Sequence, residues 1–296
     1  MTAAPAVNQA DPHDVHAMTC MEIWGGTGRS SQRVDTPGMD VHVYSEPYHG
    51  EEAGGDIHFV STCGMGNLTR LLLADVAGHG EVVSELSGKL RQLLKRHIHN
   101  LDNSDFARAL NEEFGDVADG GRFATAVIAT YFAPTDQLVV VNAGHPRPLW
   151  HSRAAGGWRL LDDEGAPAHD GAPENLPLGI IGGTNYRQFV VNLAPGDRIV
   201  LYSDALAEAA APGGAQLGEA GLLDAARRVD DPDVEKLSER LRQAVEDHRG
   251  QAPADDDATV LAIHHTGGKA PRPSLSDRLT VLAQMVGLMP VRNVSG

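Results

Sequence analysis

The segment LTRLLLADVAGHG, residues 68–80, contains a change from strand to helix around which the rest of the chain can be interpreted. Residues 68–76 are an apolar run of strand length that ends at Asp75 and Val76. A glycine-containing loop follows and leads into the helical periodicity of residues 84–99. A carboxylate at this position is carried by a rigid strand and faces a loop-lined cleft, so Asp75 is the first candidate site residue.

Strand and helix patterns continue on both sides of this segment. Strands are predicted at 41–44, 57–62, 68–76, 123–132, 138–142, 186–193, 198–203 and 259–264, and loops at 153–157 and 162–175. Helices are predicted over 84–99, 104–117 and 234–248, where apolar side chains recur at three- and four-residue spacing. Because the strands form mostly antiparallel-looking hairpins, we predict an α+β fold in which α-helices flank a central antiparallel β-sandwich.

The chain is expected to divide into three regions. Residues 1–37 are predicted to be an N-terminal leader of low order, 38–265 the main domain, and 266–296 a linker with a C-terminal helical segment. The leader lacks the features of a signal peptide, and the apolar stretch Leu279–Val291 is too short to span a bilayer. Cys20 and Cys63 have no ligand-like spacing, which argues against a disulfide framework or a cysteine zinc site. A cytoplasmic protein is expected.

The charge balance excludes some classes of partner. Lys and Arg number 24 and Asp and Glu number 40, for a formal net charge of −16. An acidic surface of this size repels the phosphates of nucleic acids and of anionic lipids, so neither nucleic acid nor a membrane is expected as a partner.

Four acidic motifs lie at strand ends or in adjoining loops. They are Gly54-Gly55-Asp56, Asp75-Val76-Ala77-Gly78-His79-Gly80, Tyr202-Ser203-Asp204 and Asp255-Asp256-Asp257-Ala258-Thr259. Each motif alone is also compatible with an ordinary turn or a solvated acidic loop. Together they suggest a metal site, because buried like charges are costly unless a cation lies between them. Oxygen ligands without a cysteine cluster favour Mg²⁺ or Mn²⁺ over zinc.

The order of the motifs carries a resemblance to a known family. Three further pieces belong to the set, Asn142-Ala143-Gly144-His145-Pro146, Leu178-Gly179 and Gly196-Asp197-Arg198. From Val41 to His264 the chain resembles the PPM family of protein phosphatase 2C-like enzymes, most of all its SpoIIE/RsbU-like bacterial branch. The resemblance implies a PPM-type phosphatase domain over 38–265, with two Mn²⁺ or Mg²⁺ ions in a cleft at one end of the β-sandwich.

The resemblance also implies roles for individual residues. The implied metal ligands are Asp56, Asp75, Val76 through its carbonyl, Asp204, Asp256 and Asp257. Asp75 is expected to bridge both ions, whereas the choice between Asp256 and Asp257 as direct ligand stays open. Asp75 and His79 are the candidate catalytic residues, His79 as proton donor to the leaving oxygen or, alternatively, as a structural residue. His145 is predicted to be a hydrogen-bonded support.

The implied activity is hydrolysis of phosphoserine or phosphothreonine on a signalling protein by water that two metal ions activate. An anti-anti-sigma-type regulator is the implied substrate, and a regulatory protein is a further expected partner. Two alternatives remain open at this point. One is a non-catalytic regulatory binding module on the same fold, and the other is a hydrolase of small phosphomonoesters.

Overall fold

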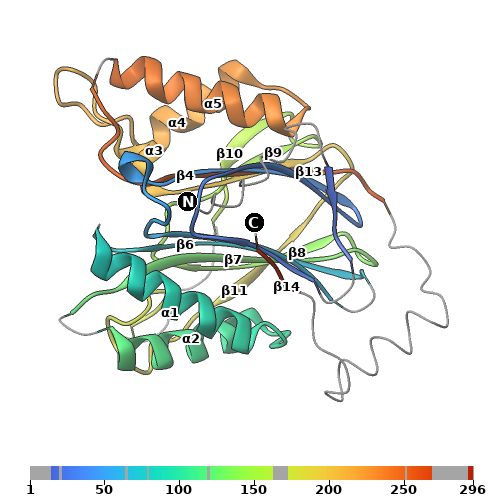
Figure 1. Ribbon diagram of the computed structural model, residues 1–296. Coiled ribbons are helices and arrows are strands. Elements are labelled where there is room, and N and C mark those ends of the chain that lie inside the picture. Colours follow the sequence, from blue (N-terminus) through green and yellow to red (C-terminus); the bar gives the residue numbers. More distant parts are fainter. Residues whose placement is uncertain are drawn as a thin grey trace, which may run out of the picture.

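Two β-sheets stacked face to face, with helices on both outer faces, form the body of the molecule (Figure 1). The computed structural model describes residues 15–19, 22–63, 66–78, 80–118, 121–162, 173–250, 252–268 and 293–295. Each sheet has seven strands in the described residues. The predicted α+β class, with helices flanking a central β-sandwich, is confirmed.

The two sheets draw their strands from distant parts of the chain. The first sheet has the order β1 (Val15–Ala17), β3 (Ser30–Thr36), β4 (Met39–Glu46), β13 (Ala258–His265), β12 (Arg198–Tyr202), β9 (Leu149–Ser152) and β10 (Gly157–Leu160). The second has the order β11 (Gln188–Asn192), β8 (Gln137–Ala143), β7 (Ala124–Phe132), β6 (Leu68–Val76), β5 (Asp56–Cys63), β2 (Ile23–Gly26) and β14 (Asn293–Ser295). Among the described strands, β1 with β3 and β14 with β2 pair parallel and the other pairs are antiparallel.

The helices fall into two groups, one on each sheet. Helices α1 (Glu81–His97) and α2 (Asn103–Val117) cover the second sheet, and α4 (Gly218–Val229) and α5 (Val234–Arg249) cover the first. The short helices are η1 (Tyr48–Gly50) and α3 (Asp204–Glu208). Local sequence explains the helix starts: the Asp102 carboxylate accepts the Asp105 N–H, and the Asp233 carboxylate accepts the N–H groups of Glu235 and Lys236.

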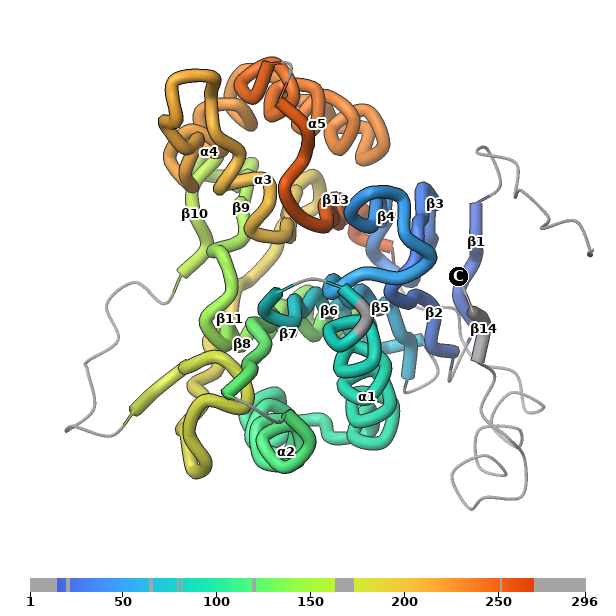
Figure 2. Tube along the Cα trace, turned by 60° about the vertical axis from the view of Figure 1, so that its left-hand side comes forward, coloured from blue at the N-terminus to red at the C-terminus, as the bar shows by residue number. Residues whose placement is uncertain are grey.

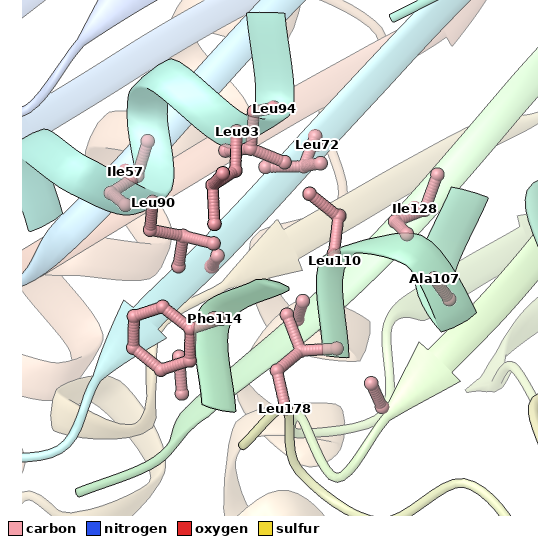
Figure 3. Packing of buried hydrophobic residues seen from close by; sticks show 14 of the residues in the cluster. Ile57, Leu72, Leu90, Leu93, Leu94, Ala107, Leu110, Phe114, Ile128 and Leu178 are labelled. Carbon is pink, nitrogen blue, oxygen red and sulfur yellow. The ribbon is translucent and has the colours of Figure 1, made fainter. Parts of the chain in front are cut away.

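Strand β6 is buried on both faces, which explains why its sequence is a continuous apolar run. Leu71 and Leu73 belong to the apolar layer between the sheets, whereas Leu72 and Ala74 face the layer under α1 and α2. Figure 3 shows this second layer, in which Leu90 and Phe114 of the two helices pack together over the sheet. A third layer lies between the first sheet and α4 with α5. The strand pair β5–β6 is therefore held from both sides.

Every strand and helix predicted between residues 41 and 264 has a counterpart in the structure, and the main correction concerns the predicted leader. Residues 15–17, 23–26 and 30–36 form strands β1, β2 and β3, so this part of 1–37 is not a leader of low order. The loop predicted at 153–157 lies between two short strands that were not predicted, β9 and β10, and α4 was not predicted either. The predicted helical segment within 275–291 lies outside the described residues.

In the part of the chain that the structure describes, no helix is long and apolar enough to cross a membrane.

Candidate active site

The predicted aspartates meet at one end of the β-sandwich. Asp56 begins β5 and lies directly opposite Asp75 of β6 in the antiparallel ladder. Asp204 begins α3, which follows β12, and Asp256 lies in the loop that leads into β13. Strand β13 contacts both β5 and α3, so the strand ends of the two sheets come together here (Figure 2). The structure thus brings together four of the carboxylates that the sequence suggested.

The electrostatics of these carboxylates show how closely they interact. Burial, followed by repulsion from Asp204 and Asp256, raises the pKa of Asp75 to about 8. Burial and the charge of Asp256 raise the pKa of Asp204 to about 6. The pKa of Asp56 is also raised, by burial and by Asp75, against hydrogen bonds from Thr259 and Ser203. Each carboxylate therefore favours a proton, or another positive charge, in its folded environment.

Asp257 has different neighbours from Asp256. Its Oδ1 accepts the Tyr48 N–H at 2.6 Å, and its Oδ2 accepts the N–H groups of Gly55 and Asp56. A Cβ on Gly54 would come within 2.4 Å of the Asp257 carboxylate, so this close approach requires glycine. Both oxygens of Asp257 are thus engaged with backbone, and the residue fastens η1 and the start of β5 to the loop before β13.

His145 connects the surroundings of Asp75 and Asp204. Its Nε2 lies 3.1 Å from the Tyr202 carbonyl oxygen, which can only accept, so Nε2 carries the proton and Nδ1 accepts from the Thr125 hydroxyl at 2.8 Å. Thr125 is the cross-strand partner of Asp75, and Tyr202 lies two residues before Asp204. Burial lowers the pKa of His145 to about 4, which keeps the ring neutral. Both ring nitrogens of His145 thus have hydrogen-bond partners, as its predicted support role requires.

Three serines that the sequence analysis did not select also position the site. The Ser203 hydroxyl lies 3.2 Å from the Asp257 carbonyl oxygen and accepts the Thr259 N–H at 2.9 Å. From α1, the Ser84 hydroxyl donates to the Ala53 carbonyl, and that of Ser87 lies 3.2 Å from the Gly55 carbonyl oxygen. Ser203 could have been predicted from the sequence, because it lies between a strand and a helix. Nothing in the sequence around Ser84 and Ser87 of α1 marks them as site residues.

The donor set suits a hard divalent cation. It consists of carboxylate oxygens, and Oδ2 of Asp56 is buried without a hydrogen-bond partner. The Val76 carbonyl oxygen lies close to Gly55, the residue before Asp56. It would be 3.0 Å from a Cβ placed on Gly55. Among the described residues, no three His, Cys, Asp or Glu side chains are arranged as a ready metal-binding group. The carboxylates lie in the same region, but their oxygen atoms do not converge on a single metal position. His79 lies outside the described residues.

Comparisons with known proteins identify a family and several relatives of this chain. The model of the Stage II sporulation protein E (SpoIIE) family matches residues 66–266. Phosphoserine phosphatase RsbU of Bacillus subtilis (strain 168) is 28% identical over 206 residues, which make up 68% of this chain and 52% of RsbU. The chain thus spans about half the length of this curated relative.

Two solved structures show the same fold. The RsbU and RsbW domains of a Mycobacterium tuberculosis protein match with a TM-score of 0.63 and 23% identity, over 90% of this chain and 70% of that one. The catalytic domain of the serine/threonine phosphatase PstP, in complex with two manganese ions, matches with a TM-score of 0.54 and 17% identity. That match covers 76% of this chain and 97% of the PstP chain.

Proposed function

The chain belongs to the SpoIIE family, and from this premise we propose that it is a metal-dependent protein phosphatase that hydrolyses phosphoserine or phosphothreonine on a signalling protein. The observation that carries the proposal is the convergence of Asp56, Asp75, Asp204 and Asp256 from both sheets. Burial and mutual repulsion raise the pKa values of Asp56, Asp75 and Asp204, as expected for closely spaced carboxylates with no cation between them. Mn²⁺ or Mg²⁺ is the cation class that such a donor set prefers.

Each residue of the site has a part in this proposal. Asp75, the Val76 carbonyl, Asp204 and Asp256 would hold the two cations, and Asp56 would contribute directly or through water. Bound cations supply the positive charge that orients the phosphoryl oxygens and lowers the pKa of a water toward neutrality. Neutral His145 keeps the ends of β7 and β12 in place, and His79 stays a predicted proton donor to the leaving oxygen.

Asp256 is the direct ligand in this proposal, and Asp257 has a positioning role. Both Asp257 oxygens already accept backbone N–H groups, so the residue holds the start of β5, where Asp56 lies. After burial, the charge of Asp256 makes the largest contribution to the raised pKa of Asp204. For Asp75, the charge of Asp256 makes the second largest such contribution, after that of Asp204. This difference in surroundings supports Asp256 over Asp257 as the proposed direct ligand.

The substrate class rests on the relatives. RsbU, the curated relative, is a phosphoserine phosphatase, which supports a phosphoserine substrate. In the Mycobacterium tuberculosis structure, an RsbU domain occurs in the same protein as an RsbW domain. This pairing supports a regulatory protein as a partner of the chain. An anti-anti-sigma-type phosphoprotein is accordingly the proposed target, with a regulatory protein as a further partner.

Phosphate release tests the proposal. The rates are measured on p-nitrophenyl phosphate and on a phosphoserine peptide, in Mn²⁺, in Mg²⁺ and in EDTA. The proteins compared are the wild type, Asp75→Asn, and Asp224→Asn as a matched control, because Asp224 lies exposed on α4. We expect metal-dependent release that Asp75→Asn abolishes and Asp224→Asn preserves.

The two alternative functions give different results in the same assay. Folded wild-type protein that releases no phosphate with either metal would indicate a non-catalytic binding module. Efficient release from p-nitrophenyl phosphate but not from phosphopeptides or phosphoproteins would indicate a hydrolase of small phosphomonoesters.

A further inference from the structure

A cavity of about 320 Å³ opens next to the candidate active site, with Asp256 in its lining. We infer that this cavity is a substrate subsite that binds an apolar side chain of the phosphoprotein, close in sequence to its phosphoserine. The inference rests on the proposed phosphatase function and adds to it a determinant of substrate choice. The cavity is called the anchor pocket below.

Apolar side chains form the floor of the anchor pocket. Leu206 of α3 and Val245 of α5 lie almost fully buried beneath it, and Ala258 contributes from the start of β13. Pro47 and Ala254 also line the pocket and add apolar surface. A concave apolar surface of this kind gains free energy when a side chain such as leucine replaces the water in it.

Polar and aromatic groups form the rim and are held in place. The Arg242 guanidinium carbon lies 3.6 Å from the centre of the Tyr44 ring. Arg249, about two turns after Arg242 on α5, also lines the pocket. Tyr48 and His49 also line the pocket, and their ring centroids lie 4.0 Å apart. Arg242 also pairs with Glu246 at 3.5 Å, and Glu46 lines the pocket as well, so its polar groups carry charges of both signs.

The anchor pocket and the candidate active site share their supports. The Tyr48 N–H donates to Oδ1 of Asp257, whose Oδ2 holds the backbone at Gly55 and Asp56. Asp256 belongs both to the pocket lining and to the group of interacting carboxylates. A side chain seated in the pocket is therefore held at a set position relative to the carboxylates. Binding energy gained there can orient a phosphoserine that lies a few residues away along the same peptide.

The test uses phosphoserine peptides of eleven residues with a neutral Ala/Gly/Ser background. A single leucine is moved from the fifth position before the phosphoserine to the fifth position after it. The variant Ala254→Trp fills the pocket from its wall, and Ala252→Trp is the matched control, because Ala252 is exposed in the same loop and outside the pocket lining. The readouts are kcat/KM in Mn²⁺ and binding of fluorescein-labelled peptides by fluorescence anisotropy. Release from p-nitrophenyl phosphate reports on folding and on the active site itself.

The wild type is expected to prefer one or two leucine positions by at least about tenfold in kcat/KM, the range in which an apolar pocket discriminates. Ala254→Trp should remove this preference through KM and leave p-nitrophenyl phosphate hydrolysis unchanged, whereas Ala252→Trp should behave as the wild type. Equal rates for all leucine positions in the wild type, or a preference that survives in Ala254→Trp, would overturn the inference. Leucine-dependent binding without any hydrolysis would contradict the phosphatase function and still support the anchor pocket.

Discussion

Neighbouring aspartates in the loop before β13 have separate tasks, because their side chains have different surroundings. Asp257 is buried and its oxygens accept three backbone N–H groups, two of them from Gly55 and Asp56. Asp256 accepts the N–H of Asp257 and interacts with the charges of Asp75 and Asp204. One residue therefore holds the loop together, and the other supplies a ligand in the proposed metal centre.

The two aspartates are expected to respond differently to alanine. Asp257→Ala leaves three backbone N–H groups without their charged acceptor and should lower the free energy of unfolding by about 2–4 kcal/mol. Asp256→Ala should change that free energy by less than about 1 kcal/mol, while metal-dependent phosphate release falls more than about tenfold. Urea denaturation and the phosphate assay measure the two effects. The reverse pattern would exchange the roles of the two residues.

Asp75 should make the metal-free protein less stable as pH rises. Its folded pKa of about 8 lies above its ordinary value of 3.8, so the folded state retains a proton that the unfolded chain has released. Stability from the protonated form is therefore lost as pH rises through about 8, and Asp75→Asn removes this loss. In EDTA, the stability of Asp75→Asn relative to the wild type should grow by on the order of 1 kcal/mol between pH 6.5 and 8.

Buried histidines do not affect this comparison, because they are present in both proteins and their contributions cancel. The measurement is the difference in melting temperature between wild type and variant at each pH. A difference that is constant across this range would show that Asp75 does not titrate there.

Among the secondary-structure elements, the connection between α1 and α2 depends on one buried arginine of β6. Arg70 is almost fully buried, and its guanidinium donates to the carbonyl oxygens of Ile98 and Asn100 and to the Thr130 hydroxyl. The guanidinium carbon also lies 4.6 Å from the centre of the Phe106 ring. The end of α1 is thereby fastened to the sheet that carries Asp75.

Replacing Arg70 by methionine should therefore loosen this connection. Arg70→Met keeps an apolar stem of similar reach but leaves the carbonyls of Ile98 and Asn100 without donors, at an expected cost of about 2–4 kcal/mol in the free energy of unfolding. Hydrogen exchange should quicken for the amides around residues 98–103. Lys89→Met is the control, because Lys89 is exposed on α1 and its pair with Glu85 contributes little. Equal stability of the two variants would contradict the account.

Elements with strong local patterns were predictable, and those that depend on their neighbours were not. The apolar run of β6 and the periodicity of α1 identify these elements directly. In contrast, β2 is a short strand ending in two glycines, Gly25 and Gly26, and becomes a strand by pairing with β5. Strands β9 and β10 similarly extend an existing sheet from β12. Tertiary pairing, which a local pattern does not contain, defines these edge strands.

In the whole molecule, the candidate site is assembled from segments that are far apart in the chain. Asp56 and Asp75 come from one sheet, and Asp204 and Asp256 from segments adjoining the other. Strand ends and turn residues identified these aspartates in the sequence, the cost of burying like charges suggested a metal site, and the resemblance supplied the role of each residue. The backbone donors to Asp257 and the anchor pocket depend on how η1, α5 and the loop before β13 meet, so no local pattern could predict them.

The central claim is that the converging carboxylates form a divalent-cation centre, and calorimetric titration with Mn²⁺ tests it most directly. The proteins are wild type, Asp75→Asn and the exposed control Asp224→Asn, each stripped of metal first. The account predicts two Mn²⁺ ions per chain for wild type and control, and loss of this binding in Asp75→Asn, which lacks the bridging carboxylate. Folded wild-type protein that binds no Mn²⁺, or an Asp75→Asn variant that binds it as the wild type does, would contradict the account.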